Sequence, residues 1–262
     1  MIGDDLGLLG LSDAMVGLRD TVRRVTKFPY PVLVSGESGS GKELVARAIH
    51  RVSRRSELCF GAVNGASLTV KLVDTELFGH VSGAFTCAVT EHAGLFEASK
   101  WDTLFLDEVS ELSGRAQSKL LRAFQNSEIR RIDENLPRWV DVRVVASTNR
   151  WFEADTSTGR FRTGLLYRLD VLRIVVLPLR ERGDAVLVLV DHFWRLAQSL
   201  TGSRATPARS NVPRWPTTTG RAMFVNSKTS FPRWLCVAPG VGPWVRPRCL
   251  PAKREMQSGR CG

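Results

Sequence analysis

Long apolar segments are absent from this chain of 262 residues. No run of 18 apolar residues occurs, so the sequence predicts no membrane-spanning helix, and the first residues lack the pattern of a signal peptide. Cysteine and histidine are also scarce. The five cysteines form no CxxC pair and the four histidines are scattered, which argues against a disulfide scaffold and against a metal cluster. We therefore expect a cytoplasmic protein that does not enter a membrane.

Proline and acidic residues are distributed unevenly along the chain. Eight of the twelve prolines follow Gly202, and residues 201–262 carry eleven Lys and Arg but only one acidic residue, Glu255. This stretch contributes +10 of the net charge of +11, whereas residues 1–200 carry 26 basic and 25 acidic residues. The overall basicity is therefore a property of the tail and gives little reason to predict that the main domain binds nucleic acid. The tail shows neither a helix face nor strand alternation, so we predict that it is disordered or non-native sequence.

A glycine-rich stretch, residues 36–43 (GESGSGKE), follows an apolar, β-branched run and precedes a helical pattern. Strand, loop and helix in this order are typical of a phosphate-binding P-loop, because converging backbone N–H groups and a helix N-terminus attract anions. The spacing fits the Walker A motif, except that glutamate stands where serine or threonine usually ligates magnesium. We predict a nucleotide-phosphate site formed by Gly36, Glu37, Ser38, Gly39, Ser40, Gly41, Lys42 and Glu43.

Apolar runs alternate with helical patterns along the first 180 residues or so. This alternation predicts an α/β fold in which a parallel sheet is covered by helices on both faces. Five strands are expected, near residues 32–35, 59–64, 103–108, 140–149 and 171–177. Helices are expected at residues 12–25, 42–50, 67–77, 116–124 and 184–200, and a loop with an apolar tip at residues 78–88.

Polar residues end three of the expected strands. Asp107 and Glu108 end one strand, and Asn64 and Asn149 end two others. Because open α/β sheets bind ligands at the carboxyl ends of their strands, Asp107 is predicted to hold magnesium, directly or through water. Glu108 is predicted to polarise the attacking water as a base. Asn149 could hydrogen-bond the γ-phosphate or the water, or could be an ordinary polar strand end.

Two arginines, Arg162 and Arg168, lie six residues apart and cannot share one helix face. Arginine suits the stabilisation of charge on a transferring phosphoryl group, often from a neighbouring subunit. Taken alone, the pair would more often be solvated surface residues.

Seven runs of the sequence, in order, resemble the AAA+ domain of bacterial enhancer-binding proteins, the ATP-driven activators of sigma-54 RNA polymerase. The resemblance covers about residues 10–195 and includes Glu43, which this family carries after the P-loop lysine. The matching runs are residues 36–43 (GESGSGKE), 76–80 (ELFGH), 83–88 (GAFTCA), 103–108 (TLFLDE), 145–150 (VASTNR), 161–169 (FRTGLLYRL) and 177–182 (LPLRER).

The resemblance implies a P-loop AAA+ three-layer fold with a central five-stranded parallel sheet, followed by an incomplete helical lid. It implies an ATPase that uses ATP and Mg²⁺ and assembles as a homo-oligomer, usually a hexameric ring. Glu108 would be the hydrolytic base with Asn64 as its switch partner, and Asn149 would be the sensor. Arg162 and Arg168 would act on the nucleotide of a neighbouring subunit.

The resemblance also implies a contact loop for the sigma-54 RNA polymerase holoenzyme, formed by Gly83, Ala84, Phe85, Thr86, Cys87 and Ala88. An aromatic residue on a glycine-flanked loop is costly to expose unless it has a partner, which supports this role. The family has glycine where this chain has Cys87, and a Cβ there disfavours any positive φ that glycine allows. We predict that ATP binding survives while coupling to sigma-54 weakens; a tolerated substitution is the alternative.

The expected domains are an AAA+ core at residues 1–182, the start of a helical lid at 183–202 and a tail outside the family at 203–262. We see no lid arginine, helix-turn-helix or other DNA-binding domain in the tail, and we expect no sensory domain before the core. The composition of the tail resembles a GC-rich coding sequence read in the wrong frame, so we hypothesise a frameshift near Ser203. Reading the other frames of the gene downstream of this position would test the hypothesis.

Three functions remain open on the sequence alone. The first is an ATPase that remodels sigma-54 polymerase. The second is a truncated, coupling-defective module that binds nucleotide without activator output. The third treats the basic tail as a DNA-binding arm, which its charge allows but no fold motif supports.

Overall fold

The computed structural model describes residues 6–66, 70–84, 88, 90–99, 102–183 and 185–201. Three residues of the expected contact loop, Phe85, Thr86 and Cys87, and the whole of the tail at 203–262 lie outside the described residues.

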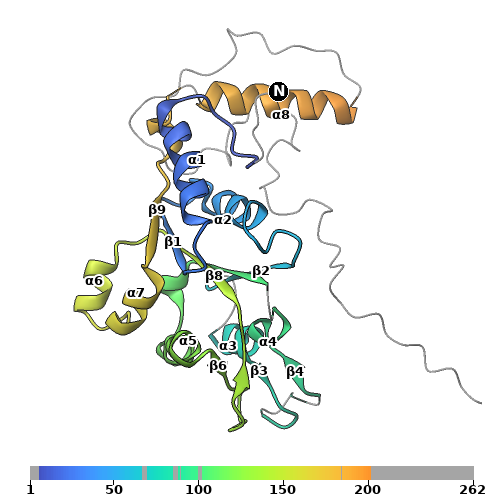
Figure 1. The fold of residues 1–262 in the computed structure, drawn as a ribbon, viewed down its shortest axis with the longest axis vertical. Helices are drawn as coiled ribbons and strands as arrows, with labels where there is room; N and C mark the ends of the chain where they lie inside the picture. The colour runs from blue at the N-terminus through green and yellow to red at the C-terminus, as the bar shows by residue number, and fades with distance from the viewer. Residues whose placement is uncertain are drawn as a thin grey trace, which may run out of the picture. The chain divides into compact units, whose positions relative to one another are not determined.

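A five-stranded parallel sheet forms the centre of the fold, in the order β2-β5-β8-β1-β9 (Figure 1). All four pairings within this sheet are parallel, which confirms the predicted α/β class. The strands are β1 (Val32–Ser35), β2 (Phe60–Asn64), β5 (Thr103–Asp107), β8 (Arg143–Thr148) and β9 (Leu172–Val175). Each coincides with one of the five apolar runs.

Helices cover both faces of the sheet, so the fold has three layers (Figure 1). Because neighbouring strand residues point to opposite faces, Leu104 and Leu106 join one core while Phe105 joins the other. The first core packs against α3, α5 and α7, and the second against α1 and α2. The α-helices are α1 (Asp13–Val25), α2 (Lys42–Arg51), α3 (Val70–Phe78), α4 (Leu95–Ala98), α5 (Gly114–Asn126), α6 (Phe152–Ser157), α7 (Thr163–Leu169) and α8 (Ala185–Thr201), and the short 3-10 helices are η1 (Val109–Glu111) and η2 (Leu179–Glu181).

Capping explains where some of these helices begin. Ser113 caps α5, because its Oγ accepts a hydrogen bond from Ala116 N at 3.0 Å. Ser12 occupies the corresponding position of α1, but its buried Oγ has no partner among the described residues.

Two antiparallel hairpins project from the sheet and were not predicted. One pairs β3 (Gly79–His80) with β4 (His92–Ala93), so the stretch expected to be loop begins with a strand. The other pairs β6 (Glu128–Ile129) with β7 (Arg138–Trp139). The expected strand start at Val140 is wrong, because Val140 N donates to Ser127 O next to this hairpin and β8 begins only at Arg143.

The last helix, α8, presents apolar side chains to solvent. Leu187, Phe193 and Leu196 are 44–54% exposed.

No helix in the described part of the chain is long and apolar enough to cross a bilayer. Cys59 is disulfide-bonded in this structure.

Candidate functional site

The carboxyl ends of four neighbouring strands bring the predicted site residues to one edge of the sheet. The register pairs Asn64 with Asp107, and Ser35 with Thr148. The glycine loop leaves β1 at this edge, and Glu108 and Asn149 directly follow β5 and β8. Residues separated by more than 100 positions in the chain therefore face the same space.

The glycine loop depends on close backbone approach. A Cβ on Gly36 would lie 2.5 Å from Val176 O, and Gly41 adopts φ +93° as the residue that precedes α2. The Oγ of Ser40 is buried and has no hydrogen-bond partner among the described residues. The loop thus presents backbone N–H groups, a helix N-terminus and an unused hydroxyl, a combination that suits a phosphate.

Lys42 lies at the start of α2 and is only 6% exposed. Its Nζ donates to Gly36 O at 3.0 Å and to Glu37 O at 3.3 Å, and lies 3.3 Å from Glu108 Oε1. The ammonium group is therefore folded back on its own loop and paired with the carboxylate of Glu108, which directly follows β5.

Asp107 is held through both carboxylate oxygens. Asn64 Nδ2 donates to Oδ2 at 2.7 Å, and the hydroxyl of Ser147 donates to Oδ1. The Asn64 amide thus binds the carboxylate next to Glu108, and its role as the switch partner of Glu108 stays a prediction. Ser147, which sequence reasoning missed although it lies in the matching run 145–150, also accepts from Glu108 N at 3.1 Å.

Glu108 stands in a left-handed backbone conformation with φ +51°, which is uncommon for a residue other than glycine. Its Oε2 accepts from the backbone N–H of Asn149 at 3.1 Å. The predicted base and the predicted sensor are thus brought together, through the main chain of Asn149.

The segment after β9 clamps the glycine loop, which sequence reasoning did not foresee. Arg180 forms a bidentate pair with Glu37, and this arginine holds the pKa of the Glu37 carboxyl below its usual value. Arg182 is buried and donates to Ser40 O and to Leu177 O. Burial lowers the pKa of Arg182, which has no carboxylate partner among the described residues. Both arginines belong to the matching run 177–182, and this run was the feature of the sequence that could have indicated their contact with the glycine loop.

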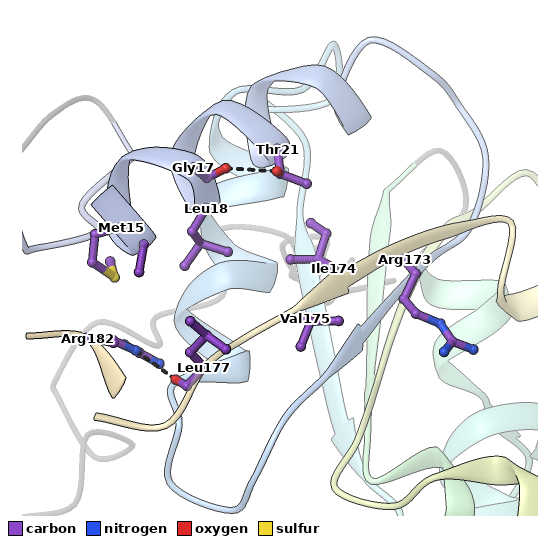
Figure 2. A pocket seen from close by; sticks show the side chains of 10 residues that line it. Met15, Gly17, Leu18, Thr21, Arg173, Ile174, Val175, Leu177 and Arg182 are labelled. Carbon is purple, nitrogen blue, oxygen red and sulfur yellow. Dashed lines mark hydrogen bonds between the residues drawn. The ribbon is translucent and has the colours of Figure 1, made fainter. Parts of the chain in front are cut away.

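A pocket of about 320 Å³ lies beside this clamp, between α1 and β9 (Figure 2). Apolar side chains line it, among them Met15, Leu18, Ile174 and Leu177, and Arg182 forms part of its wall. Because Arg182 also contacts the glycine loop, the pocket and the loop are neighbours.

The two predicted arginines lie elsewhere. Arg162 precedes α7 and Arg168 lies within it, and both are exposed. Within the described residues, neither guanidinium is paired with a carboxylate, and neither contacts the glycine loop or Glu108 of its own chain. Arg168 lines a second pocket with Tyr30, Phe124 and Val171.

The described part of the expected contact loop lies on the β3–β4 hairpin. Gly83 N donates to Ala88 O at 2.8 Å, which closes the base of the loop, and Ala84 N donates to Val81 O at 3.2 Å. Gly83 adopts φ +83° at this turn. The hairpin therefore holds Gly83, Ala84 and Ala88 at its tip.

Comparison with known proteins identifies the relatives of this chain. Residues 8–175 match the family profile of the Sigma-54 interaction domain. Nitric oxide reductase transcription regulator NorR1 of Cupriavidus necator is 42% identical over 243 residues, which cover 90% of this chain and 47% of the relative. Anaerobic nitric oxide reductase transcription regulator NorR of Escherichia coli O157:H7 is 45% identical over 197 residues, which cover 74% of this chain and 39% of the relative.

A comparison with solved structures also finds a similar protein. NtrX from Brucella abortus in complex with ADP superposes with a TM-score of 0.69 and 35% identity, and covers 76% of this chain and 43% of NtrX. The chain spans less than half the length of each of these relatives. Ninety per cent of the chain is about 236 residues, so the stretch aligned with NorR1 extends past residue 202.

Proposed function

The chain belongs to the Sigma-54 interaction domain family, and on that premise we propose that it binds and hydrolyses ATP to remodel sigma-54 RNA polymerase and so regulate transcription. The observation that carries the proposal is the convergence of Lys42, Asp107 and Glu108 at one edge of the sheet. A phosphate cradle and two strand-end carboxylates in this arrangement are what phosphoryl transfer to water requires.

The glycine loop would bind the phosphates, from Gly36 through Glu43. Its N–H groups and the N-terminus of α2 would attract the phosphate, and the Ser40 Oγ, which has no partner among the described residues, would offer a further donor. Lys42 would turn from the carbonyl groups of its own loop to the outer phosphates. The apolar pocket between α1 and β9 would take the base, because it lies next to the loop through Arg182.

Mg²⁺ fits this site only if oxygen ligands from the protein and from the phosphates coordinate it together. Among the described residues, no group of three His, Cys, Asp or Glu side chains could hold a metal ion alone. Asp107 has both oxygens oriented by Asn64 and Ser147 and would hold the ion, directly or through water. When bound, the ion would neutralise charge on the phosphate oxygens. Glu108 would accept the proton of the attacking water, with Asn149 at its side.

Arg162 and Arg168 would act in trans. Both are exposed and lie away from the glycine loop of their own chain, so a neighbouring subunit is the partner that their positions allow. We therefore propose a homo-oligomer, with a hexameric ring as the expected form.

The hairpin loop at residues 83–88 would contact sigma-54. It is carried on β3 and β4, outside the central sheet, where a change at the nucleotide edge could move it. A partner of RNA polymerase works in the cytoplasm, which is the location that we propose.

ATP turnover measured against protein concentration tests the proposal. Turnover per chain should rise with concentration, because each site would need an arginine from a neighbour. Glu108→Gln should keep nucleotide binding and lose turnover by on the order of 100-fold or more. Nucleotide binding without turnover at any concentration would instead support a truncated, coupling-defective module, the function that Cys87 and the tail favour.

A further inference from the structure

A glutamine side chain inside the core connects the segment after Glu108 with the backbone of Arg162. Gln117 lies on α5, is 1% exposed, and has no assigned part in the site described above. Its Nε2 donates to Leu112 O at 2.9 Å and to Arg160 O at 3.0 Å. Its Oε1 accepts from Arg162 N at 2.9 Å. Three backbone groups from two separate segments thus depend on one amide.

One segment leads to the proposed base, Glu108, and the other leads to Arg162, which is proposed to act on a neighbouring subunit. Leu112 directly follows the short η1 helix, which begins after Glu108. Arg162 precedes α7, and its guanidinium is exposed. Between the two anchored groups of the second segment, Phe161 is 1% exposed and packs on Phe152 with ring centroids 4.5 Å apart. The backbone on both sides of Phe161 is therefore fixed, and the direction in which Arg162 leaves the core is set.

We propose that Gln117 is a positioning residue that aims Arg162 at the nucleotide of the neighbouring subunit. The proposal rests on the function proposed above, in which Arg162 acts in trans. An exposed arginine has many rotamers, so its reach depends on where its backbone is held. The Gln117 amide holds that backbone from a rigid helix, and the same amide ties it to the η1 segment that follows Glu108.

An apolar replacement would leave these groups without partners. In Gln117→Met, which has a similar volume, Leu112 O, Arg160 O and Arg162 N each lose a hydrogen bond inside the protein. The segment before α7 can then shift toward water, and a shift of about 1 Å in a group that stabilises the reacting phosphate can lower turnover on the order of 100-fold. Nucleotide binding to the variant's own glycine loop should change little.

The experiment uses the full chain in mixed oligomers. Gln117→Met and Glu108→Gln alone should each show low ATP turnover, with Gln117→Met lowered 10- to 100-fold, as the order of magnitude for misplacement predicts. Mixed in equal amounts they should regain turnover, because a Gln117→Met subunit keeps an intact Glu108 and can receive Arg162 from a Glu108→Gln neighbour. With independent sites, about a quarter of the interfaces in a head-to-tail ring are then complete.

Controls separate this proposal from the function that it rests on. Arg162→Ala mixed with Glu108→Gln should also regain turnover; if it does not, the trans role of Arg162 fails. If that mixture recovers while Gln117→Met with Glu108→Gln stays low, Gln117 acts on its own chain's site and the positioning proposal is overturned. Gln125→Met makes the same replacement at an exposed position of α5 and should keep wild-type turnover.

A second variant keeps the proposal testable if Gln117→Met fails to fold. Gln117→Glu keeps the oxygen that accepts from Arg162 N and loses both Nε2 donors. It should show the same loss and the same recovery with Glu108→Gln, with nucleotide affinity and melting temperature measured alongside. Wild-type turnover in both Gln117 variants would overturn the proposal.

Discussion

Adding one methyl group to Gly36 tests how tightly the glycine loop is packed against β9. In Gly36→Ala the new Cβ would lie 2.5 Å from Val176 O and 2.9 Å from Ser40 Oγ. The serine can rotate, but Val176 O is backbone and must move by about 0.9 Å to reach the 3.4 Å at which ordinary contact begins. The N–H of Val176 donates to Ser35 O at 2.7 Å, so this movement would strain the junction between β1 and β9.

Overpacking of this kind costs about 1–3 kcal/mol. In a domain of this size each kcal/mol lowers the melting temperature by about 2–4 °C, so we expect a decrease of roughly 2–12 °C. Gly114→Ala is the matched control, because a Cβ at the first position of α5 meets nothing within 4 Å. There alanine should leave stability unchanged or raise it by up to about 1 kcal/mol. Thermal unfolding followed by circular dichroism measures both variants, and equal shifts in the same direction would refute the packing argument.

Two further predictions concern pH and the contact loop. Burial lowers the pKa of His50, whose Nδ1 lies 3.0 Å from Thr103 Oγ1. Near pH 6.5 the unfolded chain therefore takes up a proton on this ring, whereas the folded chain keeps the ring neutral. The contribution of His50 to stability should therefore be present above pH 6.5 and decrease as the pH falls through that value toward the lower folded pKa. His50→Gln should reduce the difference in unfolding free energy between pH 7.5 and 5.5 in denaturant titrations; an undiminished difference would contradict this cause. Cys87→Gly should increase open-complex formation on a sigma-54 promoter and leave ATP turnover unchanged. Equal rates of open-complex formation in the original chain and the variant would contradict this prediction.

The sheet and its polar edge could be predicted because they depend on local patterns. Each strand is an apolar run, and parallel strands bring their carboxyl ends to one edge, so Asn64, Asp107 and Glu108 had to meet. The family expected from the collinear motifs is confirmed by the match over residues 8–175. The roles of the individual residues, the division into domains and the frameshift stay predictions.

The hairpins and the partners of the site residues could not be predicted in the same way. Strands of two residues, such as β6 and β7, are too short to show a period, so Val140 was assigned to the wrong element. Ser147, Arg182 and Gln117 contribute through hydrogen bonds across 40 to 142 positions in the chain, which no local pattern reveals. Gln117 did leave a trace, because it is a polar residue on the helix face that carries Leu120, Leu121 and Phe124.

The contact of 3.3 Å between Lys42 Nζ and Glu108 Oε1 has a consequence for the order of events. Under the proposed function, Lys42 would turn to a phosphate, and the Glu108 carboxylate would lose its ammonium partner in the same step. A chain without nucleotide would thus keep the Glu108 carboxylate paired with Lys42, and nucleotide binding would release it. Glu108→Gln should for the same reason bind nucleotide somewhat more tightly than the original chain, and weaker binding in a direct titration would contradict this. The release of Glu108 would then be linked to nucleotide occupancy by one ion pair.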